Sequence, residues 1–207
     1  MIYGKNFVWL HFPKCAGNKT EKLFKKYYSD DAAIHQDPFD LKFDPTISWH
    51  DSIDDRIKKS ADTSFKGRLL IVPFRRLPNW LVSRYNFEKK RSPQFQHDPS
   101  KLIEGRFLES GGFENHADAY IKRYLPEHIL SEYKVKFIRV EYFEDDFKSI
   151  FGELIDLGKI PEAEFKSRTN TSSGISVEEV FSDESKIEQA YLKCPKWKKI
   201  EEIAYTP

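Results

Sequence analysis

A lysine-bearing loop near the start of the chain has the residue types of an anion-binding site. Residues 7–10 form an apolar run that predicts a strand, and residues 13–18 form a turn of mostly small residues before a predicted helix. Backbone N–H groups of such a turn converge on an oxyanion, and the positive end of the helix dipole adds to them. Lys14 supplies a full charge beside these donors. The segment predicts a phosphate or sulfate site, although many α/β proteins begin with a strand, a turn and a helix.

A second group of anion-binding side chains follows the clearest apolar run. Residues 68–74 are typical of a buried parallel strand; Arg75 and Arg76 come directly after them, and Ser83 lies eight residues beyond Arg75. Open parallel sheets bind ligands at the carboxyl ends of their strands. An arginine fork and a serine hydroxyl suit a phosphate. A pair of solvated arginines beside a helix is the plainer alternative. Together with the first loop, this group favours a ligand with two separated anionic groups.

The remaining pattern alternates between strands and helices, which positions both groups on one sheet. We expect helices at 17–28, 54–60, 78 onward, 113–130 with a break at Pro126, and 145–157, a strand at 134–140, loop at 29–46, and a charged helical tail after 174. Crossover helices between strands predict an α/β fold with a mostly parallel central sheet flanked by helices on both faces. At 207 residues the chain fits one domain over 1–207.

Composition limits the classes of function. The chain has 34 basic and 33 acidic residues and a net charge of +1, so no global field draws it to nucleic acid or to an anionic membrane. Its two cysteines, Cys15 and Cys194, give no disulfide framework and favour a reducing compartment, with one bridge left open. We find no signal peptide and no apolar run long enough for a membrane span. A cytoplasmic protein is expected.

The first loop resembles a known motif. Residues 11–18 read HFPKCAGN, which is similar to the donor-binding loop of sulfotransferases, especially the carbohydrate branch with H-[IF]-P-K-[TC]-[GA]-G-[TN]-S. The donor of that family is 3′-phosphoadenosine 5′-phosphosulfate (PAPS). Three later segments resemble family motifs in the same order: 74–85 the 3′-phosphate motif with Arg and Ser eight residues apart, 138–147 the R-x-E-x-L-x-x-D-F element, and 170–172 a segment that closes over the nucleotide.

The resemblance implies a single P-loop-like domain that transfers a sulfuryl group from PAPS to an acceptor hydroxyl, expected to be on a carbohydrate. Lys14 and the backbone N–H groups of residues 16–18 would neutralise charge on the leaving phosphate, and the family requires no metal. The implied donor-binding residues are Lys14, Cys15, Ala16, Gly17, Asn18, Lys19, Arg75, Ser83, Asn170 and Ser172.

Two positions depart from the family pattern. Lys19 stands where relatives more often have a small hydroxyl residue, so one contact to the donor is altered. Pro78 is shifted by one place, which leaves Arg75 and Arg76 as alternatives for the 3′-phosphate ligand. The spacing to Ser83 favours Arg75.

A histidine is expected to accept the proton of the acceptor, since its pKa suits general-base catalysis near neutral pH. His50 lies 25 residues ahead of Arg75, roughly where related sulfotransferases have a catalytic histidine. His35 is an alternative, at a position where some relatives use a carboxylate. His11 ends the first strand and is expected to be structural or orienting. The other three histidines have no motif around them.

Two other classes of protein stay open. In a P-loop kinase or NTPase, residues 13–20 would be a Walker A loop, but Pro13 and Asn18 would replace both of its glycines. A non-catalytic nucleotide- or glycan-binding protein on the same fold is the third possibility. The acceptor is expected to be a saccharide or another small hydroxyl compound, read by loops 29–49 and 92–112, where Trp49, Phe95 or Phe107 could stack on a sugar ring. We expect neither nucleic acid nor membrane as partner, and the oligomeric state is open.

Overall fold

The computed structural model describes the chain except for residues 38–49, 61–64, 95–96, 109–114, 167–173 and 207. The chain divides into two compact units, each with a distinct make-up. The first contains residues 1–74 and 127–169 and holds the sheet. The second contains residues 75–126 and 170–207. Its described secondary-structure elements are all helices, apart from one isolated bridge. The expectation of one domain over 1–207 stays a prediction.

The sheet of the first unit has five described strands in the order β3-β1-β2-β4-β5. The strands are β1 (Ile2–Tyr3), β2 (Phe7–Trp9), β3 (His35–Gln36), β4 (Leu69–Phe74) and β5 (Val135–Arg139). β2, β4 and β5 are parallel, whereas β1 is antiparallel to both β2 and β3. The sheet is therefore mixed, and our expectation of a mostly parallel sheet is met in part: β2, β4 and β5 follow it, whereas β1 and β3 do not. A turn closed by Gly4 N–H donating to Phe7 O joins β1 to β2, and so short a connection links only antiparallel strands.

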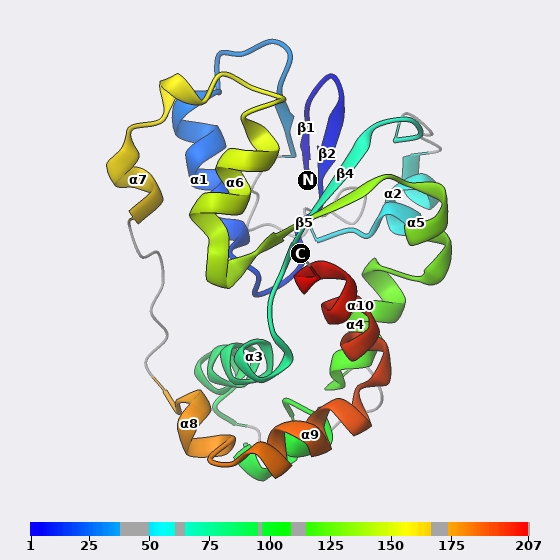
Figure 1. Ribbon diagram of the computed structural model, residues 1–207, viewed down its shortest axis with the longest axis vertical. Helices are drawn as coiled ribbons and strands as arrows, with labels where there is room; N and C mark the ends of the chain where they lie inside the picture. The colour runs from blue at the N-terminus through cyan, green and yellow to red at the C-terminus, as the bar shows by residue number, and fades with distance from the viewer. Residues whose placement is uncertain (38–49, 61–64, 95–96, 109–114, 167–173, 207) are drawn as a thin grey trace. The chain divides into compact units, whose positions relative to one another are not determined.

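Helices lie on both sides of this sheet in Figure 1. α1 (Gly17–Tyr27) and α6 (Phe143–Phe151) are on one side, and α2 (Ile53–Ser60) and α5 (Glu127–Glu132) are on the other. The short α7 (Glu162–Lys166) contacts α6. The α/β class and the helices α1, α2 and α6 were predicted, with bounds that differ by a few residues.

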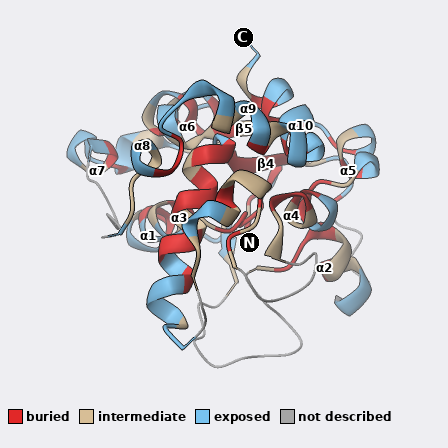
Figure 2. Ribbon diagram, turned by 90° about the horizontal axis from the view of Figure 1, so that it is seen from below, coloured by how far each residue is buried: buried red, intermediate tan, exposed pale blue. Residues whose placement is uncertain are grey.

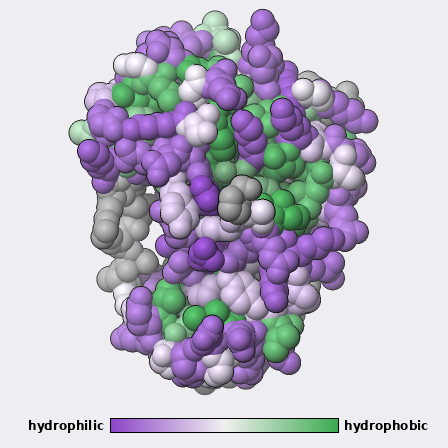
Figure 3. Space-filling model, in the orientation of Figure 1, coloured by the Kyte–Doolittle hydropathy of each residue, from purple (hydrophilic) through white to green (hydrophobic). Residues whose placement is uncertain are grey.

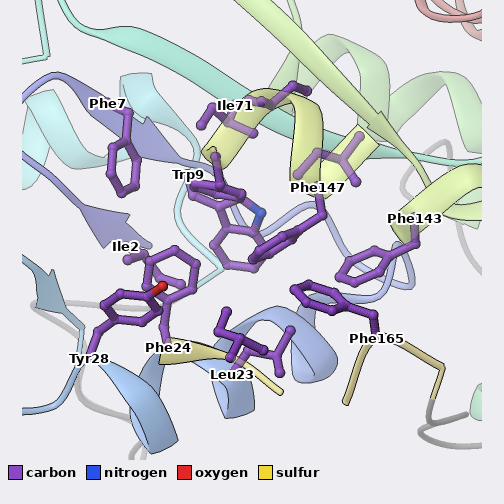
Figure 4. Packing of buried hydrophobic residues seen from close by; sticks show 14 residues of the cluster. Ile2, Phe7, Trp9, Leu23, Phe24, Tyr28, Ile71, Phe143, Phe147 and Phe165 are labelled. Atoms are coloured by element: carbon purple, nitrogen blue, oxygen red, sulfur yellow. The ribbon is translucent and has the colours of Figure 1, made fainter. Parts of the chain in front are cut away.

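An aromatic core fixes α1 and α6 against the sheet (Figure 4). Trp9 and Ile71 project from neighbouring strands toward Phe24 of α1 and Phe147 of α6. Phe147 and Phe151 have ring centroids 4.5 Å apart. Each fully buried aromatic side chain contributes roughly 1.5–3 kcal/mol by leaving water. This packing fixes the position of α1 relative to β2, and hence the two ends of the loop between them.

The second unit is built around α3 (Leu77–Arg91). Helices α8 (Val177–Val180), α9 (Glu184–Lys193) and α10 (Pro195–Tyr205) and the 3-10 helix η1 (Pro99–Glu104) all contact α3, and α10 also packs on α4 (Ala117–Tyr124). Pro78 lies in the first turn of α3 as predicted. Figure 2 shows most of α3 buried and its last turn, with three basic residues, exposed. Trp80 and Trp197 lie in contact at its centre, with ring centroids 4.6 Å apart.

Several further sequence expectations have clear outcomes. The strand at 68–74 is β4, and the strand at 134–140 is β5. Pro126 separates α4 from α5, as expected of a helix-breaking residue. β3 lies inside the segment 29–46, which we expected to be loop. The sequence did not predict this strand, because two residues are too few to give a periodic signal.

The surface in Figure 3 is mainly hydrophilic, with smaller hydrophobic areas between the polar residues. Among the described residues, no helix has the length and apolar character that crossing a membrane requires. Cys15 and Cys194 are both buried free thiols, so the disulfide that the sequence left open does not form.

Candidate anion-binding site

The loop that contains Lys14 starts at the carboxyl end of a sheet strand. β2 is parallel to β4, and the pairing continues one residue further because Leu10 N–H donates to Ile71 O at 2.9 Å. α1 begins at Gly17. The strand, loop and helix therefore have the order that the sequence predicted, with the loop at the edge where parallel sheets bind ligands.

The loop backbone is strained at two positions. Lys14 has φ of 64°, and Ala16 has φ of 60° and ψ of 19°. Both lie in the left-handed region, which costs a non-glycine residue roughly 1–2 kcal/mol. Strain of this kind gathers at ligand-binding sites, and a left-handed residue followed by a right-handed one turns consecutive N–H groups to one side. The backbone geometry is therefore compatible with a nest of converging N–H groups.

The start of α1 keeps its hydrogen-bond donors available. The N–H groups of Ala16, Gly17 and Asn18 have no acceptor among the residues that the structure describes. Ala16 supplies no side-chain cap, and the first turn contains no acidic residue. By contrast, the carboxylate of Asp183 accepts from the first turn of α9. The positive end of α1 is thus left for a ligand or water.

Cys15 and Lys19, two predicted contact residues, have structural contacts of their own. Cys15 is fully buried, and its N–H is 3.4 Å from Phe12 O. The ammonium of Lys19 donates to Phe165 O at 2.5 Å and lies 4.6 Å from the centre of the Phe143 ring. Burial lowers the pKa of Lys19, and neighbouring carboxylates partly oppose this. Lys19 therefore ties α1 to the end of α7.

The buried His11 and the partly buried Glu21 form an acid–base pair beside the start of α1. His11 Nδ1 and Glu21 Oε1 are 2.7 Å apart, and His11 is 3% exposed. Burial lowers the pKa of His11 to about 3, helped by the positive Met1 amino group, and burial raises the pKa of Glu21 to about 8. Both directions favour a neutral pair, in which a protonated Glu21 donates to a neutral His11. Sequence analysis missed Glu21, whose one signal is a carboxyl one turn into the helix after the loop.

His50, the predicted base, lies in contact with this pair. The rings of His11 and His50 have centroids 4.4 Å apart and planes at 62°. The fold thus brings His50 next to a residue three positions before Lys14. The alternative base, His35, is an exposed residue of β3 whose ring packs on Tyr3 at 5.9 Å. Position therefore favours His50 over His35.

The arginines that follow β4 belong to the second unit and differ in their contacts. The Arg76 guanidinium lies 3.4 Å from Glu201 Oε1 and stacks over Tyr205 at 4.4 Å. Arg75 Nε is buried and has no acceptor among the described residues, while Arg75 O accepts from Trp197 Nε1 at 3.3 Å. Arg76 is thus committed to a contact within its unit, which favours Arg75 as the ligand-binding residue.

Glu201 is a second carboxylate that sequence analysis missed. It accepts from Leu77 N–H at 2.9 Å and from Tyr191 O–H at 2.7 Å, and it is 6% exposed. It therefore caps α3 from the protein itself, and the start of α3 needs no external anion. Burial and Glu201 together raise the pKa of Tyr191. Ser83, also on α3, is partly buried.

The predicted site residues thus fall into three groups. Residues 14–19 and His50 lie in the first unit, and Arg75 and Ser83 lie in the second. Asn170 and Ser172 lie outside the described residues. That one ligand contacts both arginine and lysine loops stays a prediction. In the described part of the chain, no cluster of His, Cys, Asp and Glu side chains could hold a metal ion.

Comparison with known proteins adds no relative to this picture. No family model matches the chain, no curated protein matches it, and no solved structure matches it.

Proposed function

We propose that the protein is a sulfotransferase that moves the sulfuryl group of PAPS to an acceptor hydroxyl, with a carbohydrate as the expected acceptor. The observation that carries this proposal is the strained, uncapped loop between β2 and α1. Its two left-handed residues and three available N–H groups suit a phosphosulfate group, and Lys14 adds a positive charge. We also propose a cytoplasmic location, because both cysteines are free and buried.

The proposed reaction is an in-line displacement. The acceptor oxygen attacks the sulfur of PAPS, the bond between sulfur and the bridging phosphate oxygen breaks, and the electron pair stays on the 5′-phosphate. Lys14 and the N–H groups of Ala16, Gly17 and Asn18 would stabilise the charge that develops there. His50 would accept the proton that the acceptor loses. The chain thus supplies charge, orientation and a base.

The 3′-phosphate of the donor would be held by Arg75 and Ser83. The buried Nε of Arg75, which has no acceptor among the described residues, and the hydroxyl of Ser83 fit such a group, whereas Arg76 already pairs with Glu201. Asn170 and Ser172 keep their proposed contacts on the resemblance alone.

A P-loop kinase or NTPase is less compatible with the site. Lys19 would be its Walker lysine and would need to reach the nucleotide phosphates. Its ammonium instead donates to Phe165 O and stacks over Phe143. A non-catalytic nucleotide- or glycan-binding protein remains the other candidate, since the same loop would bind a nucleotide without turnover.

Calorimetry with adenosine 3′,5′-bisphosphate, AMP and ATP tests the proposal. We expect the bisphosphate to bind more tightly than AMP, and Lys14→Ala to weaken it. Lys22→Ala, on an exposed position of α1, is the matched control and should bind like the wild type. Sulfated product from PAPS and a panel of saccharides would separate the enzyme from a binding protein. Equal affinity for bisphosphate and AMP, or turnover of ATP with Mg²⁺, would contradict the proposal.

A further inference from the structure

Glu21 and His11 connect two parts of the proposed site. His11 Nδ1 bonds to Glu21 Oε1 at 2.7 Å on one side of the imidazole. On the opposite side, His11 Nε2 lies 2.1 Å from the point that a Cβ on Gly17 would occupy. The ring also packs against His50, with centroids 4.4 Å apart. One buried imidazole therefore contacts the carboxyl of α1, the first residue of that helix and the predicted base.

We propose that Glu21 and His11 are positioning residues of the proposed anion-binding loop, residues 13–18. In this pair, the proton on Glu21 selects the tautomer of His11. The inference rests on the proposed function only for the identity of the ligand. When Glu21 is protonated, its O–H donates to Nδ1, so the proton of the neutral imidazole is on Nε2. When Glu21 is ionised, Nδ1–H must donate to it, and Nε2 becomes an acceptor.

The change of tautomer matters because of what lies beside Nε2. A donor at Nε2 adds to the N–H groups at the start of α1 and favours an anion, whereas a lone pair there opposes one. The ring cannot move away, since it is held between Trp9, at 5.3 Å, and His50. Loss of the Glu21 proton therefore changes the tautomer of His11, and this one rigid side chain contacts both the loop and His50.

Other charged groups lie near the pair. The amino group of Met1 acts on both His11 and Glu21, and the carboxylate of Asp37 acts on Glu21. Burial lowers the pKa of the Met1 amino group, and Asp37 opposes this shift. The Asp37 carboxylate lies 2.7 Å from the Met1 amino group and 2.6 Å from the Arg56 guanidinium, so these charges compensate one another. His50 is the remaining titratable ring in contact with His11. None of these groups hydrogen-bonds to Glu21 among the described contacts. The protonation state of Glu21 therefore sets the tautomer of His11.

Nitrogen NMR of the histidine rings tests the pair without any ligand. In the wild type we expect the proton of His11 to move from Nε2 to Nδ1 between pH 6.5 and 9.5, with a shift of the His50 resonances at the same midpoint. In Glu21→Gln the amide N–H donates to Nδ1 at every pH, so His11 should keep its proton on Nε2 throughout. Glu153→Gln, an exposed carboxyl of the same unit, is the matched control and should behave like the wild type. A single His11 tautomer over this range in the wild type, or the same midpoint in Glu21→Gln, would overturn the proposal.

Binding measurements then separate this inference from the proposed function. We expect Glu21→Ala to weaken adenosine 3′,5′-bisphosphate roughly 10- to 100-fold, as misplacement of a binding group does, and Glu21→Gln to restore near wild-type affinity at pH 7. Wild-type affinity should fall above pH 8, and that of Glu21→Gln should not. Equal affinities of Glu21→Ala and the wild type would overturn the positioning role. A wild type that changes tautomer but does not bind the bisphosphate would end the sulfotransferase proposal and leave the pair intact.

Discussion

His11 Nε2 occupies the space that a side chain on Gly17 would need, since an added Cβ would lie 2.1 Å from it. The loop of residues 13–18 and the buried histidine are therefore matched in shape, and glycine is required at position 17 for close packing.

The Gly17→Ala substitution tests this match. We expect it to destabilise the protein by about 1–3 kcal/mol, because the His11 ring is buried and overpacking forces a shift. Chemical denaturation measures the loss. In the double variant with His11→Ala, the two losses should be clearly less than additive, because the clash is gone. Additive losses would mean that the two residues do not compete for this space.

Ala16 offers a test of backbone strain. With φ of 60° and ψ of 19° it lies where glycine is favoured, so Ala16→Gly should stabilise the folded state by up to about 1 kcal/mol. Ala190→Gly in α9 is the opposite control and should destabilise by about 1 kcal/mol, since Ala190 is in a helix interior. Urea denaturation measures both. A destabilised Ala16→Gly variant would contradict the left-handed geometry.

The Glu21–His11 pair predicts a particular dependence of stability on pH. The pKa of Glu21 rises from 4.5 to about 8 on folding, and that of His11 falls from 6.5 to about 3. Between pH 4.5 and 6.5 the folded state binds one proton more on Glu21 and one fewer on His11, so the two contributions cancel. Stability should fall as pH rises from 6.5 to about 8, and also as pH falls from 4.5 toward 3.

Denaturation at a series of fixed pH values, for the wild type and Glu21→Gln, measures this profile. The difference between the two proteins removes the contribution of other groups. We expect the fall above pH 6.5 to be absent from Glu21→Gln. The stability of this variant should instead fall as pH drops from 6.5 toward 3, since His11 is unchanged and no proton on Glu21 offsets it between pH 4.5 and 6.5. Parallel curves for the two proteins above pH 6.5 would argue against a protonated Glu21.

The two neighbouring arginines should separate binding from stability. Arg75→Ala should weaken adenosine 3′,5′-bisphosphate while leaving AMP affinity nearly unchanged, because only the former has a 3′-phosphate. Arg76→Ala should lower the melting temperature slightly and leave both affinities alone, since Arg76 pairs with Glu201 and stacks on Tyr205. Calorimetry and thermal melts make the comparison. The reverse ranking would reassign the 3′-phosphate ligand to Arg76.

Periodicity was sufficient to predict the main elements around the site. The continuous apolar run gave β4, and Pro78 located the start of α3. It could not give β1 or β3, because each has two residues and forms only through pairing in the tertiary structure. The mixed sheet followed from these two strands, so the expectation of a mostly parallel sheet was met only for β2, β4 and β5.

The candidate site was predictable in part for a similar reason. Lys14 and Gly17 could be chosen because loop chemistry depends on residues that are adjacent in sequence. Glu21 and Glu201 could not, since their importance comes from partners brought by folding, His11 for one and the start of α3 for the other. A pKa that is raised by burial cannot be predicted from the sequence alone, because the same carboxyl in water would be ionised at neutral pH.

The role of His50 as the base is the most demanding prediction. A general base acts in the transferring step, so His50→Ala should lower kcat by roughly 10²–10⁴ and leave the affinity for adenosine 3′,5′-bisphosphate nearly unchanged. The rate of the wild type should fall on the acidic side, because a protonated imidazole cannot accept the proton of the acceptor. This limb should vanish in His50→Ala. His35→Ala, at the exposed strand β3, is the matched control and should keep both rate and limb. Loss of rate in His35→Ala with a normal His50→Ala would transfer the role to His35, and equal loss of nucleotide affinity and rate in His50→Ala would make His50 a binding residue.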